Sequence, residues 1–194
     1  MHTFYKTQKS GVNMTTKIWL TADSHFGDKN ILKYENRPFQ DVDFTEHGKT
    51  DFMDNEIIRR WNSVVAKDDM VFHLGDVGAH NTEQMKKIIN SLNGYKTLIM
   101  GNHDKDSSRN TKWWRNVGFD EVSEYPIVIE DYIILRHEPP TYFNDATPFF
   151  FIYGHVHSTD LYKTITKSTA CVCVERWDYS PVELARIRDL VSIA

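Results

Sequence analysis

The sequence predicts an α/β fold, and three observations support that prediction. Short apolar runs typical of buried strands alternate with helical patterns in the first half of the chain. The second half is richer in apolar runs than in helical patterns. No repeat and no low-complexity linker interrupts the 194 residues, so we expect one domain over residues 17–194.

Residues 1–16 are predicted to form a polar N-terminal extension ahead of this domain. The segment lacks the apolar core of a secretion signal. We expect it to be poorly ordered, and Met14 is an alternative start of translation.

Strands and helices are predicted to alternate between residues 17 and 100. The strands are expected at residues 17–22, 70–74 and 96–100. Apolar residues recur at helical spacing over residues 50–65 and again after Thr82, which is a candidate N-cap. Asn93 and Gly94 would end this second helix.

The rest of the chain is predicted to be mainly strand. A helix or loop is expected over residues 107–118. Strands are expected at residues 121–130, 132–136, 149–153 and 170–175, with a turn at Glu130 and Asp131 between the first two. A last helix is predicted with Ser180 at its N-cap, Pro181 at its first position and Glu183 at the capping-box position.

Composition and charge exclude several classes of protein. The formal net charge of −4 gives no global basic field, so a nucleic-acid partner is not indicated. No apolar run approaches the roughly 20 residues of a membrane-spanning helix. Cys171 and Cys173 imply no disulfide framework and are expected to pack in the core, so the reducing cytoplasm is the expected location. The sequence does not indicate the oligomeric state.

Polar side chains follow five of the predicted strands at the point where each strand ends. These residues are Asp23, His25, Asp76, Asn102, His103, Asp104, His137, His155 and His157. Ligands of open α/β sheets bind outside the carboxyl ends of the strands, so the set is expected to form one site. Its oxygen and nitrogen donors, without a thiolate, suit Mn²⁺, Fe, Zn²⁺ or Ni²⁺.

These motifs resemble the calcineurin-like metallophosphoesterase superfamily. The matching segments, which extend from about residue 17 to the C-terminus, are Asp23-x-His25, Gly75-Asp76, Gly101-Asn102-His103-Asp104, His137 and Gly154-His155-x-His157. The runs TADSHFGDKNILKYENRPF, RWNSVV, HLGDV and VERWDYSPV further resemble a small single-domain bacterial and phage subgroup. The resemblance implies a four-layer α/β/β/α sandwich of two mixed sheets flanked by helices, with the site at one edge of both sheets.

The resemblance also implies two divalent metal ions, with Mn²⁺ the first candidate. The implied ligands are Asp23, His25 and His157 for one metal (the first ligand set), Asn102, His137 and His155 for the other (the second ligand set), and Asp76 as a bridge between both. His103 corresponds to a catalytic histidine that contacts the substrate or the leaving group without binding metal. Asp104 is predicted to orient His103, and Arg37 is predicted to contact the substrate phosphate.

Several other residues are not expected to be metal ligands, and the roles of some of them are left open. His73 is expected to be a packed core histidine, and His80 could reach the rim of the site. Trp113 and Trp114 could stack on a base or pack in the core. Asp28 departs from the histidine expected after Phe-Gly in the resembling subgroup; it could support a ligand histidine, alter substrate preference, or be a surface replacement.

The predicted function is hydrolysis of phosphoesters by attack of a metal-bridging hydroxide. Protein phosphatases of the superfamily continue Gly-Asp with Asp-Arg-Gly, whereas this chain reads GDVGAH, so small phosphodiesters or nucleotides are favoured over phosphoproteins. The alternatives are an inactive scaffold of the same fold for protein–protein contacts, and a small metal-dependent nuclease.

Overall fold

The computed structural model describes residues 16–39, 48–141 and 147–193. The predicted polar extension therefore lies, apart from Thr16, outside the described residues. Within these ranges, none of the helices has the length and apolar character needed to cross a membrane.

The first sheet has five strands in the order β4-β3-β2-β1-β9. They are β1 (Ile18–Thr21), β2 (Met70–His73), β3 (Tyr95–Ile99), β4 (Glu121–Ser123) and β9 (Val182–Glu183). Strands β1 to β4 pair in parallel, and β9 adds an antiparallel edge beside β1. The carboxyl ends of four neighbouring strands thus meet at one edge of this sheet.

The second sheet has four strands in the order β5-β6-β7-β8. They are β5 (Ile127–Ile129), β6 (Ile133–Leu135), β7 (Phe150–Tyr153) and β8 (Thr169–Cys171). Strands β6, β7 and β8 run parallel, and β5 is antiparallel to β6. Both sheets are therefore mixed, and with their flanking helices they confirm the predicted fold class.

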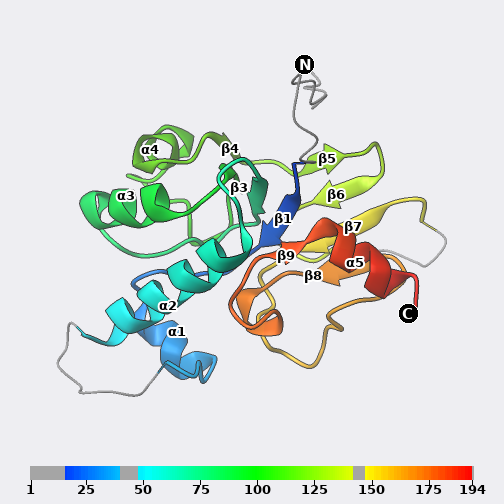
Figure 1. The fold of residues 1–194 in the computed structure, drawn as a ribbon, viewed down its shortest axis with the longest axis horizontal. Coiled ribbons are helices and arrows are strands. Elements are labelled where there is room, and N and C mark those ends of the chain that lie inside the picture. The colour runs from blue at the N-terminus through cyan, green and yellow to red at the C-terminus, as the bar shows by residue number, and fades with distance from the viewer. Residues whose placement is uncertain (1–15, 40–47, 142–146, 194) are drawn as a thin grey trace.

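Helices cover the outer face of the first sheet, and the second sheet packs on its inner face (Figure 1). The helices are α1 (Lys29–Tyr34), α2 (Gly48–Val64), α3 (Thr82–Ser91), α4 (Thr111–Val117) and α5 (Leu184–Val191). One core cluster, which includes Trp61 of α2 and Leu98 of β3, joins helices α1 to α4 with outward side chains of the first sheet. A second cluster fills the space between the sheets, where Leu184 and Ile187 of α5 also pack.

The predicted start of the last helix is wrong. Val182 and Glu183 pair with β1 as strand β9, so the helix begins at Leu184 and Glu183 takes the N-cap position. Pairing at the free edge of β1 satisfies backbone groups that a helix beginning at Pro181 would leave exposed at that edge.

Three other boundaries also differ from the predictions, and one short helix was not predicted. The run over residues 121–130 divides into β4 and β5, which belong to different sheets. The run over residues 170–175 ends as a strand at Cys171, and Val174–Arg176 form a 3₁₀ turn, η1. Helix α3 is capped by Asn81 rather than Thr82, and α1, which the apolar pattern is too short to reveal, is capped by Asp28.

Candidate metal centre

The loops that follow five strands converge where the two sheets meet. Asp23 donates its backbone N–H to the Gly75 carbonyl (2.9 Å), which joins the loops after β1 and β2. His155, after β7, donates its backbone N–H to Asp23 Oδ2 (2.9 Å), which joins the second sheet to the first. The polar residues predicted at the strand ends are thereby brought to one place.

The first ligand set gathers around buried Asp23. One donor atom from each of Asp23, His25 and His157 lies within 4.8 Å of the other two. His157 Nε2 is 3.8 Å from Asp23 Oδ1. This separation is too long for a hydrogen bond, but it suits two donors that each lie about 2.0–2.2 Å from a shared ion.

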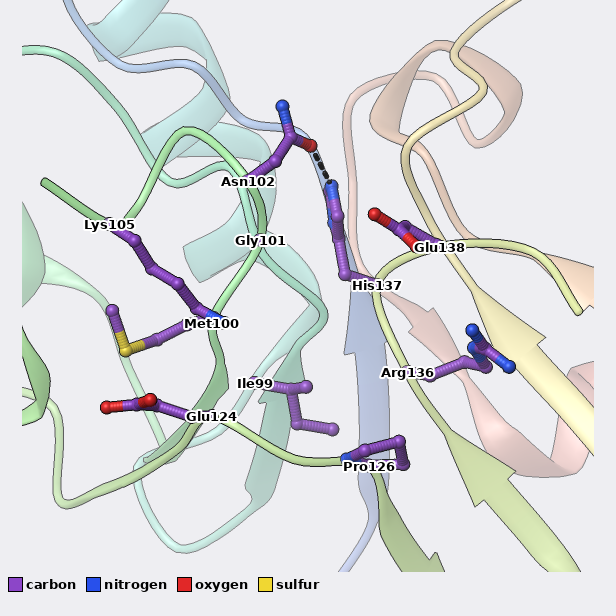
Figure 2. Close-up of a pocket in the computed structure, with 10 residues that line it drawn as sticks. All are labelled: Ile99, Met100, Gly101, Asn102, Lys105, Glu124, Pro126, Arg136, His137 and Glu138. Atoms are coloured by element: carbon purple, nitrogen blue, oxygen red, sulfur yellow. Dashed lines mark hydrogen bonds between the residues drawn. The ribbon is translucent and has the colours of Figure 1, made fainter.

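The second ligand set lies beside the first. Donor atoms of His137 and His155 cluster with Asp76 within 4.8 Å. Asn102 Oδ1 lies 2.9 Å from His137 Nε2, the contact drawn in Figure 2. Asp76 Oδ2 is 3.4 Å from His137 Nε2 and 3.8 Å from His25 Nε2. Asp76 therefore stands between the two sets, where a bridging carboxylate is expected.

Two buried polar atoms of the first ligand set have no hydrogen-bond partner among the described residues. They are Asp23 Oδ1 and His25 Nε2. A buried polar atom left unsatisfied costs about 1–3 kcal/mol, so a native protein normally pairs it. A cation bound between these atoms would satisfy both, and the residues present therefore fit a divalent metal ion.

The backbone of the site is left-handed at an unusual number of positions. Residues with positive φ in the two ligand sets and their bridge are Asp23 (60°), His25 (51°), Asp76 (56°), His155 (72°) and His157 (46°). Non-glycine residues are uncommon in this region, and such outliers concentrate at functional sites. Five such residues in one small region therefore support its assignment as a functional site.

Charges within the site perturb one another strongly. Burial alone would lower the pKa of His137, but Asp76 and Asp23 outweigh it and raise that pKa to about 9. Burial would raise the pKa of Asp76, but the contact with His137 outweighs it and lowers that pKa to about 2. Burial raises the pKa of Asp23. The carboxylates thus attract positive charge, and a bound cation would displace the proton of His137.

Asp104 braces the loops and does not orient His103 as predicted. Its carboxylate is fully buried and accepts backbone N–H groups of Asp76 (2.7 Å), Val77 (2.9 Å) and Gly101 (2.8 Å). These bonds tie the loop after β2 to the loop after β3. Asp104 therefore has no access to substrate.

His103 occupies an exposed position beside the first ligand set. Its backbone N–H donates to Asp76 Oδ1 (2.9 Å), and its ring centroid lies 5.6 Å from that of His25. The side chain is exposed, so it can contact a molecule bound at the site.

Arg37 is buried completely, so the prediction of a direct substrate contact is wrong. Its guanidinium donates to the carbonyls of Asp23 (2.7 Å) and Ser24 (2.8 Å). It also pairs with Glu175 (2.5 Å). Its polar partners are thus backbone carbonyls of the loop after β1 and buried side chains.

Asp28 lies where it can support a ligand histidine. Its Oδ1 accepts the backbone N–H of Asn30 (2.8 Å) as the N-cap of α1, and its Oδ2 is 3.6 Å from His25 Nδ1. The contact with His25 is the main reason that the pKa of Asp28 is lowered. Of the three roles left open by the sequence, support of His25 is the one that this geometry favours.

His73 is a core residue, as predicted. It is fully buried and stacks on Trp61, and its Nε2 lies 2.5 Å from Ser24 Oγ. Burial lowers the pKa of His73 to about 3, so its ring is neutral in the folded protein. His80 pairs with Asp54 (2.6 Å) rather than with either ligand set.

Core packing also accounts for Trp114, so its open alternative of base stacking is excluded. Trp114 is fully buried and donates its indole N–H to the Asp104 carbonyl (2.8 Å). Arg109, which lies over the ring of Trp113, donates to the backbone carbonyls of residues 78, 79 and 80.

A cavity of about 340 Å³ opens beside Asn102 and His137 (Figure 2). Ile99, Met100 and Pro126 contribute apolar surface to its lining. Lys105, Glu124, Arg136 and Glu138 also line it. It is a mixed polar and apolar space next to the second ligand set.

Glu175 is the residue of the site that the sequence patterns did not single out. Its Oε1 lies 3.0 Å from Nδ1 of His157. The only signal in the sequence was its place in the run VERWDYSPV.

A family model for calcineurin-like phosphoesterases matches residues 16–178. The chain belongs to the calcineurin-like phosphoesterase family. The match includes every residue of both ligand sets and Asp76, so the predicted superfamily is confirmed. As a phosphoesterase of this family, the protein is a metal-dependent hydrolase of phosphoric esters in general terms.

Relatives of this calcineurin-like phosphoesterase occur in an archaeon and in phages. It is 32% identical to an uncharacterized protein, MJ1445, of Methanocaldococcus jannaschii, over 90% of this chain and 91% of that protein. It is 25% identical to the Gene 66 protein of Mycobacterium phage D29, over 91% of this chain and 96% of that protein. A crystal structure of AQ665 from Aquifex aeolicus, a protein of unknown function, superposes with a TM-score of 0.65 at 25% identity, covering 91% of this chain and 100% of that one.

Proposed function

We propose that this protein hydrolyses small phosphodiesters or nucleotides with two divalent metal ions, Mn²⁺ being the first candidate and Fe, Zn²⁺ and Ni²⁺ the others. The main support is the arrangement of two donor clusters on either side of Asp76, together with the unpaired buried atoms of Asp23 and His25. The donors are oxygen and nitrogen atoms, which suit these metals.

The ions, when bound, would act as Lewis acids on the phosphoryl oxygens and on the attacking water. The chain's own residues divide the remaining work. Asp76 would hold both ions, and each ligand histidine would bind through its unprotonated nitrogen. His103, exposed beside the first ligand set, would donate a proton to the departing oxygen. The cavity beside Asn102 would receive the part of the substrate that does not react.

The scaffold alternative predicts lost ligands, whereas Asp76 and all six residues of the two ligand sets are present. The nuclease alternative has no support in the net charge of −4. The cytoplasmic location, the small-molecule partner and the single-domain organisation stay predictions.

Metal analysis and an assay with bis(p-nitrophenyl) phosphate test the proposed function. Protein stripped with a chelator and reloaded with Mn²⁺ should bind two ions and hydrolyse the diester. The Asp76→Asn variant should lose both properties, because the carboxylate between the clusters is removed. The matched control Asp69→Asn, which alters a buried carboxylate bonded to Trp19, should keep them. A wild-type protein that binds no metal and turns over no ester would support the scaffold instead.

The His103→Ala variant tests the assignment of the proton donor. It should retain both ions yet lose about 10²–10⁴-fold in rate on alkyl esters, because an alkoxide leaving group needs a proton. Nitrophenolate leaves without one, so nitrophenyl esters should lose far less. Equal losses on both kinds of substrate would show that His103 only positions the substrate.

A further inference from the structure

Two buried residues from distant parts of the chain meet directly behind the first ligand set. Arg37 lies in the run ENRPF and Glu175 in the run VERW, 138 residues apart. Arg37 Nε donates to Glu175 Oε1 (3.0 Å), and Arg37 Nη2 donates to the same oxygen (2.5 Å). Their side chains are 0% and 4% exposed, so neither can contact a substrate.

Glu175 contacts the ring of His157 on the side opposite Asp23. Its Oε1 lies 3.0 Å from His157 Nδ1, whereas His157 Nε2 faces Asp23 Oδ1 at 3.8 Å. A carboxylate accepts but cannot donate, so this contact places the proton of the neutral ring on Nδ1. The lone pair of Nε2 is then directed toward Asp23, where the first metal ion would bind.

Arg37 also supports the backbone of Asp23, another member of the first ligand set. Its Nη2 also donates to the Asp23 carbonyl (2.7 Å), and its Nη1 donates to the Ser24 carbonyl (2.8 Å). Asp23 has a left-handed backbone (φ 60°), so its position needs support from its surroundings. One guanidinium thus links the loop after β1 to Glu175, which in turn contacts the loop after β7.

The 3₁₀ turn η1 also binds the backbone of the loop that carries His157. Arg176, next to Glu175, donates its Nε to the His157 carbonyl (2.6 Å) and its Nη2 to the Thr159 carbonyl (2.7 Å). Consecutive residues of this turn therefore fix the ring and the backbone of one ligand. The sequence pattern predicts a strand over residues 170–175, whereas Val174 and Glu175 belong to this turn, so the pattern does not reveal the role of Glu175.

The second ligand set has no comparable ion pair behind it among the described residues. His137 is oriented by a backbone group, with its Nδ1 lying 2.7 Å from the Leu74 carbonyl. A substitution at Arg37 or Glu175 should therefore affect the two metal positions unequally.

We propose that Arg37 and Glu175 are positioning residues that fix the tautomer and orientation of His157, and with them the affinity of the first metal position alone. The inference rests on the proposed function, because it assigns the two residues to the metal centre proposed there. It gives the two runs ENRPF and VERW a role at the metal centre although neither supplies a metal ligand.

The Glu175→Gln variant tests this by titration calorimetry with Mn²⁺ on chelator-stripped protein. The amide keeps the shape of the side chain but loses its charge and its pairing with Arg37. One of the two binding steps, that of the first metal position, should lose about 10–100-fold in affinity, as is typical for residues that orient metal ligands, while the other stays unchanged. The matched control Asp69→Asn should leave both steps unchanged, because that buried carboxylate lies outside the site.

A second measurement on the wild-type protein does not depend on how the variant folds. Nitrogen-15 NMR of the Zn²⁺-loaded protein should show His157 with its proton on Nδ1. The proposal is overturned if Nδ1 carries no proton, or if Glu175→Gln weakens both binding steps equally or neither. A wild-type protein that binds no Mn²⁺ would instead remove the proposed function, so the two failures are distinguishable.

Discussion

Asp28 shows how a single carboxylate can serve a helix and a ligand at once. One oxygen caps α1 through Asn30, and the other lies 3.6 Å from Nδ1 of His25. His25 Nε2 is one of the unpaired buried atoms, so the far side of the ring is the side that faces the metal position. Asp28 therefore contacts Nδ1 of His25 as Glu175 contacts Nδ1 of His157, but the side chain of Asp28 is more exposed than that of Glu175.

We expect Asp28→Asn to keep the helix cap, because asparagine caps nearly as well as aspartate. Its loss of charge should weaken Mn²⁺ binding by a factor of about 10 or less, at the lower end of the range for such supporting residues, because the contact with His25 is long and partly exposed. Calorimetric titration measures this change. Asp28→His, which restores the residue expected in the resembling subgroup, should bind both ions; unchanged binding in both variants would make Asp28 a bystander.

At the residue scale, the sequence predicted which side chains gather at the candidate metal centre but not which residues support them. Strand ends that carry Asp, Asn or His are visible as short local patterns. The roles of Arg37 and Asp104 are not, because an arginine or aspartate beside a ligand motif has the same pattern whether it faces substrate or backbone. Only burial and the long-range contact with Glu175 decide between these, and both depend on the tertiary fold.

At the element scale, the loops after β2 and β3 depend on close packing at Gly101. A Cβ atom there would collide with Oδ1 of Asp76 and would lie 2.8 Å from its backbone nitrogen. The absence of a side chain at this glycine lets the loops approach, so that Asp104 can accept N–H groups from both. Asp76 thus depends on the loop after β3 for its place.

The Gly101→Ala variant should lose Mn²⁺ binding and diester hydrolysis together, since the added methyl group displaces Asp76. Gly118→Ala is the matched control. It strains the end of α4, where φ is 124°, but it lies away from both ligand sets. We expect the control to lose stability, of the order of 1 kcal/mol, yet to bind two ions as measured by metal analysis. Full metal binding by Gly101→Ala would contradict this account.

Elements with long apolar periodicity were predictable, and those decided by pairing partners were not. Helix α2 and strands β1 to β3 follow their local patterns closely. The capping signals at Ser180 and Glu183 are genuine local preferences, but β1 has a free edge that Val182 and Glu183 fill. Such competition between a local cap and a distant strand depends on contacts that local sequence does not contain.

At the scale of the whole molecule, His73 couples the core to pH. The ring lies within the core between Trp61 and Phe119 and is neutral when folded, since burial lowers its pKa to about 3. In the unfolded chain it would titrate near the ordinary value of about 6.5. The unfolded state therefore binds one more proton between these values, and the contribution of His73 to stability is lost as pH falls below about 6.5.

The difference in unfolding free energy between wild type and His73→Gln should therefore shrink on acidification. A full proton difference corresponds to about 1.4 kcal/mol per pH unit, so about 2 kcal/mol should disappear between pH 7 and pH 5. Denaturant-induced unfolding of both proteins, at a constant concentration of chelator, measures this difference. The ligand histidines are the same in both proteins, so their titration cancels. A difference that does not vary with pH would contradict a neutral buried His73.

The left-handed backbone of five residues at the candidate metal centre bears on whether this site has a function. Each non-glycine residue held at positive φ costs of the order of 1 kcal/mol, and five of them stand in one small region. Glycine adopts this backbone conformation without the steric cost that Asp and His bear. The strain at these five positions is therefore offset by what the side chains do, which supports a site that binds a ligand rather than an inert surface.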